Sequence, residues 1–566
     1  MEKIREAPQE IPETREGVSA EELDSINKRN KNYEEARKLR ASMGLAPEAE
    51  SSASIESFIG DAERFIREER TENVVIDNLE PGREYEINLE NPQFPFGTAI
   101  DFDLIFPISA TREELLARYP DREREIDEYL SRIISEKYRK EYLKIIKTKF
   151  NGLVPEDTFK WERMVGLNGE RDFEATDRQM EFLRSNPELL RNFRGHNIFW
   201  NRTLHLPEHL KKKTKEEIKK EALESRLEII RRYPDIKEWD LINEPLLREP
   251  HINENGVNVN EVVVDPTEDL DFFVELFKRA KEIAPESKFY VNEYSLLSGK
   301  KTAEFIDFIQ KLKNAGAQID GIGIQGHISE YDFASIDQIK QNLESLSKLD
   351  IPLKITEFDI SDETVEKMYF SADARQKEKE KVYNIITSVY HEAIKIKGLK
   401  SSNNEDIRSV LMDFLNQNLG EIKLISDEEK GLIVSQAIES SSEEEFVEKL
   451  KTKMGNTIKA RIDSEFDGKV EELRSDYVKK AMIIFYGTQL VEGVYVWGFQ
   501  DRAHWRSRNF GEHAGFFNDD FETNQVGNEY LKLTQETWRT KKLVVANSQG
   551  QATFRGFPGG YSTNPR

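Results

Sequence analysis

The feature that most constrains the fold of this chain is a regular alternation of short apolar segments with amphipathic ones. Eight segments rich in β-branched and aromatic residues recur, at 96–100, 150–155, 196–200, 239–244, 289–294, 321–326, 353–359 and 494–499. Between them lie stretches with helical periodicity, such as 216–233, 269–283 and 302–316. Strands that alternate with helices indicate an α/β protein with a parallel sheet, and eight such units predict a (β/α)8 TIM barrel. An open doubly wound sheet is the alternative fold.

One interval breaks this rhythm. The chain between Glu357 and Trp497 is several times longer than the preceding step between two apolar segments. The extra residues, roughly 395–466, show helical periodicity and contain the capping-box pattern Ser442-x-x-Glu445. The sequence therefore predicts a helical insertion before the last strand. Its role stays open between a surface elaboration and a lid or docking module, and a protein partner for it is unknown.

The N-terminal part of the chain differs from the rest. Residues 1–60 are polar, which predicts a tail that is partly disordered or helical. From Asn73 the sequence alternates apolar and polar positions around a turn at Pro81-Gly82, which suggests a strand pair, and we expect residues 61–93 to form a flanking β segment. The barrel is expected to begin near residue 94.

Charge and missing residue types exclude several classes of protein. The net charge of −24 over 566 residues argues against nucleic-acid binding. The chain has no cysteine, which excludes disulfides, thiolate nucleophiles and Cys-ligated metals. No apolar run is long enough for a membrane helix, and the first residues lack the apolar core of a secretion signal. We expect no membrane partner. We expect the chain to be cytoplasmic, or exported by a route that the sequence does not reveal.

Two carboxylates end segments that are expected to be barrel strands. Glu244 ends the segment 239–244, and Glu357 lies near the end of 353–359. The C-terminal ends of barrel strands form one rim, so both side chains should face one cavity. Retaining glycoside hydrolysis needs two carboxyl groups about 5–5.5 Å apart, one as acid/base and one as nucleophile. The pair suggests a glycosidase, whereas either Glu alone is typical of a strand-end salt bridge.

Two other patterns point to different chemistry. The sequence Gly321-Ile-Gly-Ile-Gln-Gly326 matches the GxGxxG fingerprint of an NAD-dependent enzyme, but its isoleucines favour a strand over a strand-to-helix turn. His205 and His209 have the spacing of two metal ligands on a helix, but Pro207 between them disfavours that helix. We therefore expect neither NAD nor a metal site.

Aromatic and histidine side chains near the strand ends suit a sugar-binding groove. Indole rings stack on the C–H faces of sugars, and Trp200, Trp497 and Trp505 are candidates for that contact, with core packing as the alternative. His196 and His327 each follow a glycine near a strand, where a histidine can hydrogen-bond a carboxylate.

Read in order, these segments resemble glycoside hydrolase family 10, the endo-β-1,4-xylanase family of (β/α)8 barrels. The resemblance is carried by Phe94–Ile100, Pro155–Trp161, Arg194–Trp200, Trp239–Pro245, Val291–Tyr294, Asp320–His327, Ile355–Asp359 and Val496–Asp501. It covers 94–538 apart from the insertion, and it implies that 539–566 forms a further flanking β segment.

The resemblance also implies roles for individual residues. Glu244 would be the acid/base, and Glu357 the nucleophile that forms a covalent glycosyl-enzyme intermediate. Asn243 would bind the sugar 2-hydroxyl, and His327 with Asp359 would hold Glu357. The residues implied to line the subsites on the non-reducing side are Glu156, Lys160, His196, Trp200, Gln325, Trp497 and Trp505. No cofactor and no metal are implied.

The chain departs from the family pattern at two positions near these residues. Asp157 stands where the family usually has Asn, and Asn201 stands where a His often follows the Trp. We expect a retaining hydrolase of β-1,4-xylosidic bonds in xylan or xylo-oligosaccharides, with that glycan as its partner. The alternatives are a barrel glycosidase for another β-glycan and an inactive carbohydrate-binding homologue, and endo or exo action stays open.

Overall fold

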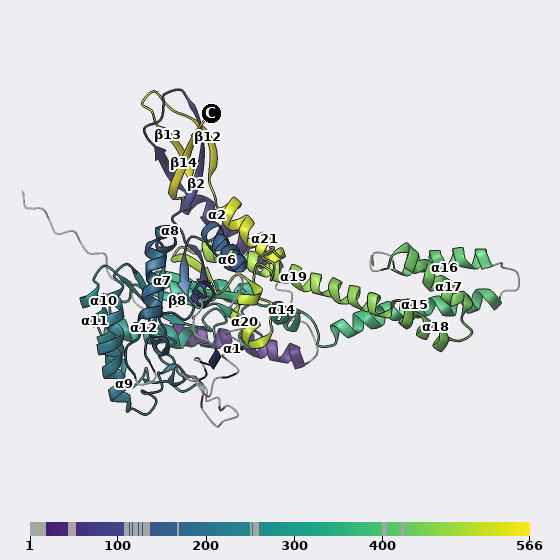
Figure 1. Cartoon of the computed structure of the whole chain (residues 1–566), viewed down its shortest axis with the longest axis horizontal. Helices are drawn as coiled ribbons and strands as arrows, with labels where there is room; N and C mark the ends of the chain where they lie inside the picture. Colours follow the sequence, from purple (N-terminus) through teal and green to yellow (C-terminus); the bar gives the residue numbers. More distant parts are fainter. Residues whose placement is uncertain are drawn as a thin grey trace, which may run out of the picture. The chain divides into compact units, whose positions relative to one another are not determined.

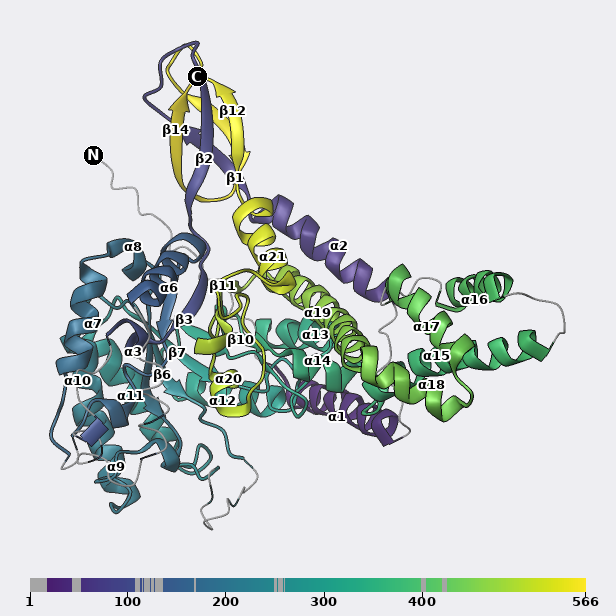
Figure 2. The ribbon, with the colours of Figure 1, turned by 45° about the vertical axis from the view of Figure 1, so that its right-hand side comes forward.

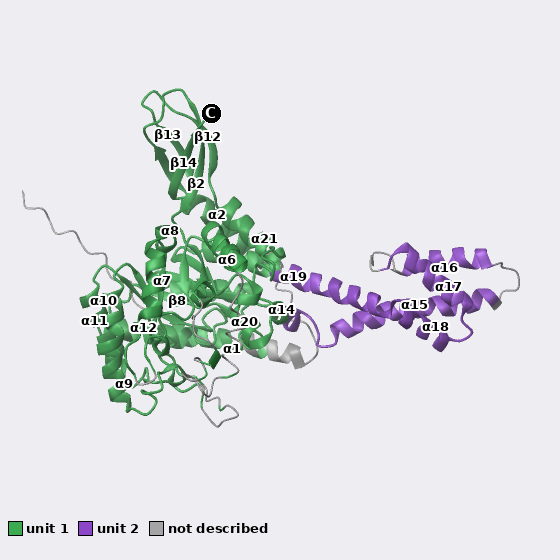
Figure 3. Cartoon of the chain, in the orientation of Figure 1, with its two compact units in different colours: residues 1–39, 48–364, 475–566 green, residues 40–47, 365–474 purple. Residues whose placement is uncertain are grey.

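The computed structural model describes residues 18–42, 52–106, 136–166, 169–248, 260–398, 404–419 and 425–566, together with positions 112, 113, 116, 123, 127, 252 and 258. The chain divides into two compact units (Figure 3). The barrel unit comprises residues 1–39, 48–364 and 475–566, and the helical unit comprises residues 40–47 and 365–474. In sequence, the larger segment of the helical unit therefore interrupts the barrel unit before its last barrel strand.

The barrel unit is built around eight parallel strands. They are β3 (Phe96–Ile100), β4 (Leu153–Pro155), β5 (Arg194–Trp200), β6 (Glu238–Asn243), β7 (Lys288–Glu293), β8 (Gly321–Ile324), β10 (Leu353–Ile360) and β11 (Val491–Val496). Their order in the sheet is β4-β3-β11-β10-β8-β7-β6-β5, and a parallel bridge between Leu153 and Phe193 joins its two ends. The short strand β9 (His327–Ile328) pairs beside β10. The predicted (β/α)8 barrel is confirmed, and the open doubly wound sheet is wrong.

Helices follow the strands and cover the outside of the barrel (Figure 1). They are α3 (Phe102–Ile105), α6 (Glu136–Lys149), α7 (Glu174–Arg184), α8 (Pro187–Leu190), α9 (Lys215–Glu221), α10 (Leu227–Arg232), α11 (Leu270–Ile283), α12 (Thr302–Asn314), α13 (Ile336–Ser347) and α21 (Gln525–Leu531), while α14 (Asp362–Tyr369) and α19 (Asn456–Tyr486) each cross a unit boundary. Helix α20 (Trp505–Phe510) instead lines a cavity at the strand ends. All eight residues of β10 are buried, as are all four of β8. Strands covered on both faces lose the exposed positions of an open sheet. In β10 the buried positions include the polar side chains of Lys354, Thr356, Glu357 and Asp359.

The flanking β segments combine the two ends of the barrel unit. Strand β2 (Glu84–Pro92) pairs antiparallel with β12 (Lys541–Val545) and β14 (Gly559–Pro565), and β1 (Glu72–Ile76) pairs with β13 (Ala552–Gly556). Figure 2 shows β2 between the two C-terminal strands. The predicted pairing of the two strands around Pro81-Gly82 is therefore wrong.

The connection between β1 and β2 explains this difference. It is longer than the tight turn of a hairpin, and its backbone bonds to the C-terminal segment instead. Leu79 N–H donates to Gly550 O at 2.9 Å, and Gly82 N–H donates to Ala546 O at 2.8 Å. Apolar side chains from both ends, including Ile87 and Phe554, share one buried cluster.

Helix α1 (Ala20–Ser42) begins the described part of the chain, and its residues 20–39 belong to the barrel unit. The buried Asn30 side chain donates to Gly299 O at 3.0 Å and to Asn342 Oδ1 at 3.2 Å. Helix α2 (Ser52–Glu69) follows. Of the predicted tail 1–60, residues 1–17 and 43–51 lie outside the described residues.

The helical unit has its own apolar core. It contains α15 (Ala374–Gly398), α16 (Asn404–Leu419), α17 (Asp427–Glu439), α18 (Glu443–Leu450) and the first part of α19. Val389, Leu411, Ile433 and Phe446 are buried together in it. Ser442 caps α18 by accepting the N–H of Glu445. The range 395–466 proposed for the insertion from sequence lies inside this unit, which begins earlier and ends later.

Candidate active site

The polar residues at the C-terminal ends of the barrel strands line one cavity of about 860 Å³. Of the twelve predicted site residues, all but Asp359 line it: Glu156, Lys160, His196, Trp200, Asn243, Glu244, Gln325, His327, Glu357, Trp497 and Trp505. They lie near the C-terminal ends of different strands or in the loops that follow, which the closed barrel brings to one rim. Among the described residues, no helix is long and apolar enough to cross a membrane.

Glu357 lies in β10 and is buried at the base of this cavity. Its Oε1 accepts a hydrogen bond of 2.7 Å from Asn292 Nδ2, and its Oε2 lies 3.1 Å from His327 Nε2. Asn292 is itself fixed, because Thr356 donates to its Oδ1 at 2.7 Å. Both carboxylate oxygens therefore have a donor, and the side chain is held in one orientation.

His327 lies between two carboxylates. Its Nδ1 lies 2.9 Å from Asp359 Oδ2, on the side opposite Glu357. Burial alone lowers the pKa of His327, but the charges of and hydrogen bonds with Asp359 and Glu357 outweigh it and raise the pKa to about 10. The imidazolium thus donates from both ring nitrogens at neutral pH.

Asp359 lies behind the cavity and connects His327 to helix α20. Trp505 Nε1 donates to its Oδ2 at 2.6 Å, and Arg506 Nε donates to its Oδ1 at 2.9 Å. Burial raises the pKa of Asp359, but the charges of Arg506 and His327 outweigh that effect and hold the pKa far below its usual range. Asp359 is therefore a permanent anion that orients His327 and Trp505.

Glu244 follows the last residue of β6 with a left-handed backbone, at φ 52°. A residue other than glycine rarely adopts this conformation, which is costly and is found at functional sites. Gln325 Nε2 donates to Oε1 of Glu244 at 3.1 Å. Oε2 of Glu244 lies 3.3 Å from Arg202 Nε and also binds Arg248.

The two arginines decide the charge of Glu244. Burial raises the pKa of this carboxyl, but Arg248 and Arg202 outweigh it and lower the pKa to about 2. With Arg202 and Arg248 in place, Glu244 is therefore a carboxylate at neutral pH. An acid/base residue must carry a proton in one step of its cycle, and the pairing with the two arginines opposes that protonation.

Amide side chains connect the two glutamates. Asn292 Nδ2 donates to Asn243 Oδ1 at 2.8 Å as well as to Glu357. Gln325 Nε2 lies 3.4 Å from the same Asn243 oxygen. Asn243, Asn292 and Gln325 thus form a continuous polar floor from Glu244 to Glu357.

His196 adds a second histidine beside Glu357. Its Nδ1 lies 3.0 Å from Asp240 Oδ2 and 4.0 Å from Oε1 of Glu357. Asp240 in turn is paired with the buried Arg194. The buried ion pair of Asp240 with Arg194 thus fixes the position of the His196 ring.

The side of the cavity after β4 is densely charged. Lys160 is bound to Asp157, which also lies 3.5 Å from Arg163. Glu156 is bound to Arg508. Burial raises the pKa of Glu156 to about 7, although Arg508 opposes this shift. Both Glu156 and Lys160 therefore already have charged partners within the site.

The three predicted tryptophans differ in how open they are. One face of Trp200 is covered by His205, whose ring stacks on it at 3.6 Å between centroids. Trp497 makes edge contacts with both His196 and His327. Trp505 is fixed by its bond to Asp359 and by Phe510, at 5.6 Å between ring centroids.

Sequence reasoning missed several residues that contact the two glutamates or their partners. Asn292 ends β7 as Asn243 ends β6, so its strand-end position was a usable signal. Arg202 and Arg248 stand shortly after strand ends, and Arg248 is four residues after Glu244. Nothing in the sequence pattern marked Arg506 or Arg508 as site residues.

The structure also places the GxGxxG segment and the His205/His209 pair, the two patterns that pointed to NAD or a metal. Gly321–Ile324 is strand β8 and is followed by strand β9, so the GxGxxG segment lacks the helix that a dinucleotide fingerprint opens. His205 stacks on Trp200, while His209 lies 3.4 Å from Glu221. Across the part of the chain that the structure describes, no group of three or more His, Cys, Asp or Glu side chains is arranged to hold a metal ion.

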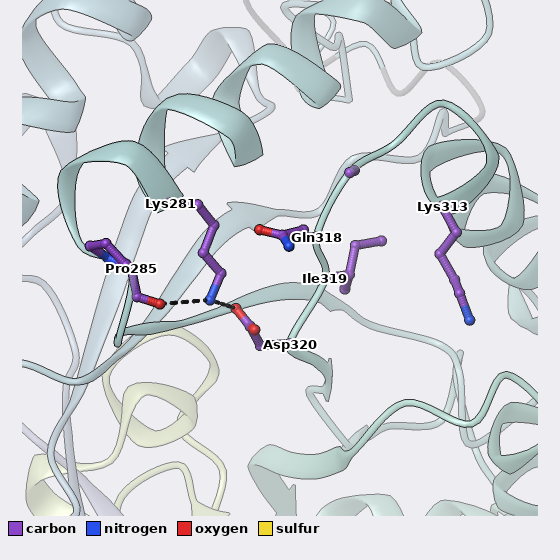
Figure 4. A pocket seen from close by; sticks show the side chains of 7 residues that line it. Lys281, Pro285, Lys313, Gln318, Ile319 and Asp320 are labelled. Carbon is purple, nitrogen blue, oxygen red and sulfur yellow. Dashed lines mark hydrogen bonds and ion pairs between the residues drawn. The ribbon is translucent and has the colours of Figure 1, made fainter. Parts of the chain in front are cut away.

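A second pocket, of about 440 Å³, lies before the starts of β7 and β8 (Figure 4). Lys281 crosses it, with Nζ 2.8 Å from Asp320 and 3.4 Å from Pro285 O. Its residues precede strands instead of following them, so it belongs to the end of the barrel associated with stability.

The fold and the cavity define a (β/α)8-barrel protein with two buried carboxylates on its C-terminal rim. The model of glycosyl hydrolase family 10 matches residues 124–419, which is more than half of the chain. The chain belongs to glycosyl hydrolase family 10.

Relatives agree with this assignment. A β-1,4-xylanase of Dictyoglomus thermophilum is 29% identical over 221 residues, covering 39% of this chain and 60% of the relative. Endo-1,4-beta-xylanase A of Caldicellulosiruptor saccharolyticus is 28% identical over 222 residues, covering 38% of this chain and 63% of the relative. The match thus spans about three fifths of each xylanase. The anti-sigma-I factor RsgI6 of Acetivibrio thermocellus is 23% identical over 428 residues, covering 75% of this chain and 39% of that protein.

Among solved structures, a GH10 endoxylanase retrieved from a sugarcane soil metagenome is similar with a TM-score of 0.47 and 18% identity. The match covers 78% of this chain and 97% of that one.

Proposed function

We propose that this protein is a retaining glycoside hydrolase that cleaves β-1,4-xylosidic bonds in xylan or xylo-oligosaccharides. The observation that carries the proposal is the position of Glu244 and Glu357 in one cavity, at the ends of β6 and β10, connected by the amides of Asn243, Asn292 and Gln325. Xylan is favoured as substrate because relatives of this family member are named xylanases.

In the first step, Glu357 is the nucleophile. Its carboxylate oxygen forms a bond to the anomeric carbon of the sugar, while the bond from that carbon to the glycosidic oxygen breaks. Glu244 gives its proton to the departing oxygen, so that the leaving sugar departs as a neutral alcohol. Asn243 is placed to bind the sugar 2-hydroxyl, where a hydrogen bond strengthens as the oxocarbenium-like transition state forms.

In the second step, the roles of the acid/base are reversed. Glu244, now a carboxylate, takes a proton from a water molecule, and the water oxygen attacks the anomeric carbon. The bond to Glu357 breaks, and Glu357 is again a carboxylate. Two displacements on opposite faces of the sugar leave the anomeric configuration unchanged, which defines a retaining enzyme.

His327 supports this cycle as a positioning residue. Its 3.1 Å contact with Glu357 stabilises the carboxylate before attack and again when it leaves. Asp359 keeps the imidazole charged and oriented through the 2.9 Å contact on the other nitrogen. Neither step needs a metal or a cofactor.

The remaining predicted residues are assigned to sugar binding on the non-reducing side. Glu156 and Lys160 lie after β4, His196 and Trp200 lie in β5, Gln325 follows β8, and Trp497 and Trp505 lie after β11. Tryptophan rings offer apolar faces to sugars, while the charged groups fix hydroxyls.

A second candidate function is supported by one observation. Glu244 is paired with both Arg202 and Arg248, which favour its ionised form. A site that never protonated Glu244 would bind a β-glycan without cleaving it, as an inactive carbohydrate-binding homologue does.

One assay separates these functions. Reducing ends released from xylan are measured for the wild type, for Glu357→Gln and for Arg171→Gln, whose arginine forms an exposed ion pair with Glu228. The proposal predicts release by the wild type and Arg171→Gln, and a loss of at least about a thousandfold in Glu357→Gln. Xylan binding without release would favour the carbohydrate-binding function, and release that survives in Glu357→Gln would contradict the assigned nucleophile.

A further inference from the structure

The three side chains that contact the Glu244 carboxylate all present N–H groups to it. Gln325 Nε2 donates to Oε1, and Arg202 and Arg248 both face Oε2. A protonated carboxyl group needs an acceptor for its O–H, and none of these three side chains offers one in this arrangement. The site as it stands therefore favours a carboxylate over the acid that the first displacement requires.

Two of the three donors are fixed. The Arg202 side chain is 2% exposed, and its guanidinium donates to Asn201 O and Leu246 O at 3.3 Å. Gln325 is buried on the cavity floor. These groups have little room to leave Glu244.

Arg248 is the partner that can move. Its side chain is 24% exposed and lines the cavity, and it lies over the ring of Tyr294 at 3.9 Å from the centroid. A cation over an aromatic face gains modest energy in an open site, so this contact is a weaker restraint than the backbone bonds of Arg202.

The position of Arg248 in the cavity indicates which part of a bound glycan would displace it. Apart from Gln325, which follows β8, the residues assigned to the non-reducing side lie in β5 or in the loops after β4 and β11, whereas Arg248 and Tyr294 come from the loops after β6 and β7. Arg248 therefore lies on the side where the leaving sugar binds, beside the residue that must protonate that sugar.

We propose that Arg248 is a positioning residue that locks Glu244 as a carboxylate in the empty site, and that a sugar entering the leaving-group side releases the lock by displacing the guanidinium. The inference rests on the proposed function, because it assigns Arg248 to the acid step of that reaction. With Arg248 displaced, Glu244 takes up a proton from the buffered solvent, and its O–H then has the glycosidic oxygen as acceptor. The chain thereby couples proton uptake to occupation of the site.

Titratable groups from the neighbouring elements act on Glu244: three cations, and from β7 and its end the carboxylate of Glu293, paired with Lys301 at 2.9 Å, and the phenol of Tyr294. Arg202 follows β5, Arg248 follows β6, and Lys301, just before α12, also favours the carboxylate. Replacing Arg248 by a neutral residue removes one of these three cations and should make Glu244 easier to protonate. The other two remain in place in every variant.

The test measures protonation directly and turnover separately. The carboxyl group of Glu244 is titrated by 13C NMR in glutamate-labelled wild type, Arg248→Gln and Arg248→Lys, with Glu244→Gln to assign the signal. We expect the titration midpoint to rise by about one pH unit or more in Arg248→Gln and to stay near the wild-type value in Arg248→Lys. An unchanged midpoint in Arg248→Gln would overturn the lock.

Turnover is measured with two aryl β-xylobiosides. At pH 7, kcat/KM for the phenyl glycoside, which needs an acid, should rise about tenfold in Arg248→Gln. For the 2,4-dinitrophenyl glycoside, which departs without a proton, it should change by less than about twofold. Equal changes for both substrates would contradict the lock. A raised midpoint with no turnover of either glycoside would leave the lock in place and refute the proposed function.

Discussion

Nε2 of His327 lies 3.1 Å from Oε2 of Glu357, the proposed nucleophile. The other ring nitrogen lies 2.9 Å from Asp359, so one imidazole joins two buried carboxylates. A charged histidine in this position stabilises both anions, and its loss would leave them facing each other without a cation between them.

The first prediction concerns stability at alkaline pH. The pKa of His327 is raised to about 10 in the folded chain, against about 6.5 in an unfolded one. Since the folded value is the higher one, its stabilising contribution is complete below about pH 6.5 and is lost as the pH rises through about 10. Urea unfolding of wild type and His327→Gln between pH 6 and 10.5 should show a stability difference that shrinks with rising pH.

The comparison with the variant isolates His327 from other groups. Burial lowers the pKa of Lys354 to about 8, which acts in the opposite direction over part of this range. The titration of Lys354 is common to both proteins and cancels in the difference. A difference that stays constant from pH 6 to 10.5 would show that His327 is not charged by its carboxylate partners.

The second prediction concerns Arg506. Its guanidinium is bound to Asp359, and the side chains of both residues are almost fully buried. Arg506→Met keeps the apolar volume but leaves Asp359 with one charged partner fewer, which should lower the free energy of unfolding by about 3 kcal/mol. The exposed ion pair of Arg171 with Glu228 provides the control, because Arg171→Met should cost less than about 1 kcal/mol. Equal losses in the two variants would refute a special role of the buried pair.

The third prediction concerns Asp157. This carboxylate binds Lys160, which is proposed to contact the sugar. Asp157→Asn frees the ammonium group and adds an amide donor, so KM for xylotetraose should fall about threefold to tenfold while kcat stays unchanged. An aryl β-xyloside, whose single sugar reaches only the reacting position, should show no change. A fall in kcat for both substrates would indicate instead that Asp157 supports the reacting centre.

Much of the barrel could be predicted from sequence because its strands are short segments rich in β-branched and aromatic residues that alternate with amphipathic helices. Polar residues such as Glu244 and Glu357 then mark the strand ends, which topology brings to one rim. This reasoning placed both glutamates and His327 at the rim, and the structure has them in one cavity.

The parts that sequence reasoning missed depend on contacts between distant segments. The Pro81-Gly82 turn suggested a local strand pair, but β1 and β2 pair with strands more than 400 residues later, since the C-terminal segment supplies their backbone partners. The pairing of Glu244 with Arg202 arises from loops after two different strands. Side-chain choices of this kind are set by packing and charge in three dimensions, and no local pattern encodes them.

The covalent bond that Glu357 is proposed to form with the sugar can be trapped with a slow substrate. The wild type is incubated with 2,4-dinitrophenyl 2-deoxy-2-fluoro-β-xylobioside, in which the fluorine slows turnover of the intermediate while the good leaving group speeds its formation. Mass spectrometry of the intact protein and of its peptides then locates any adduct. We predict a mass increase of one fluoroxylobiosyl group, carried by the peptide that contains Glu357 and absent in Glu357→Gln. A protein without an adduct, or an adduct on a different residue, would contradict the assignment of Glu357 as the nucleophile.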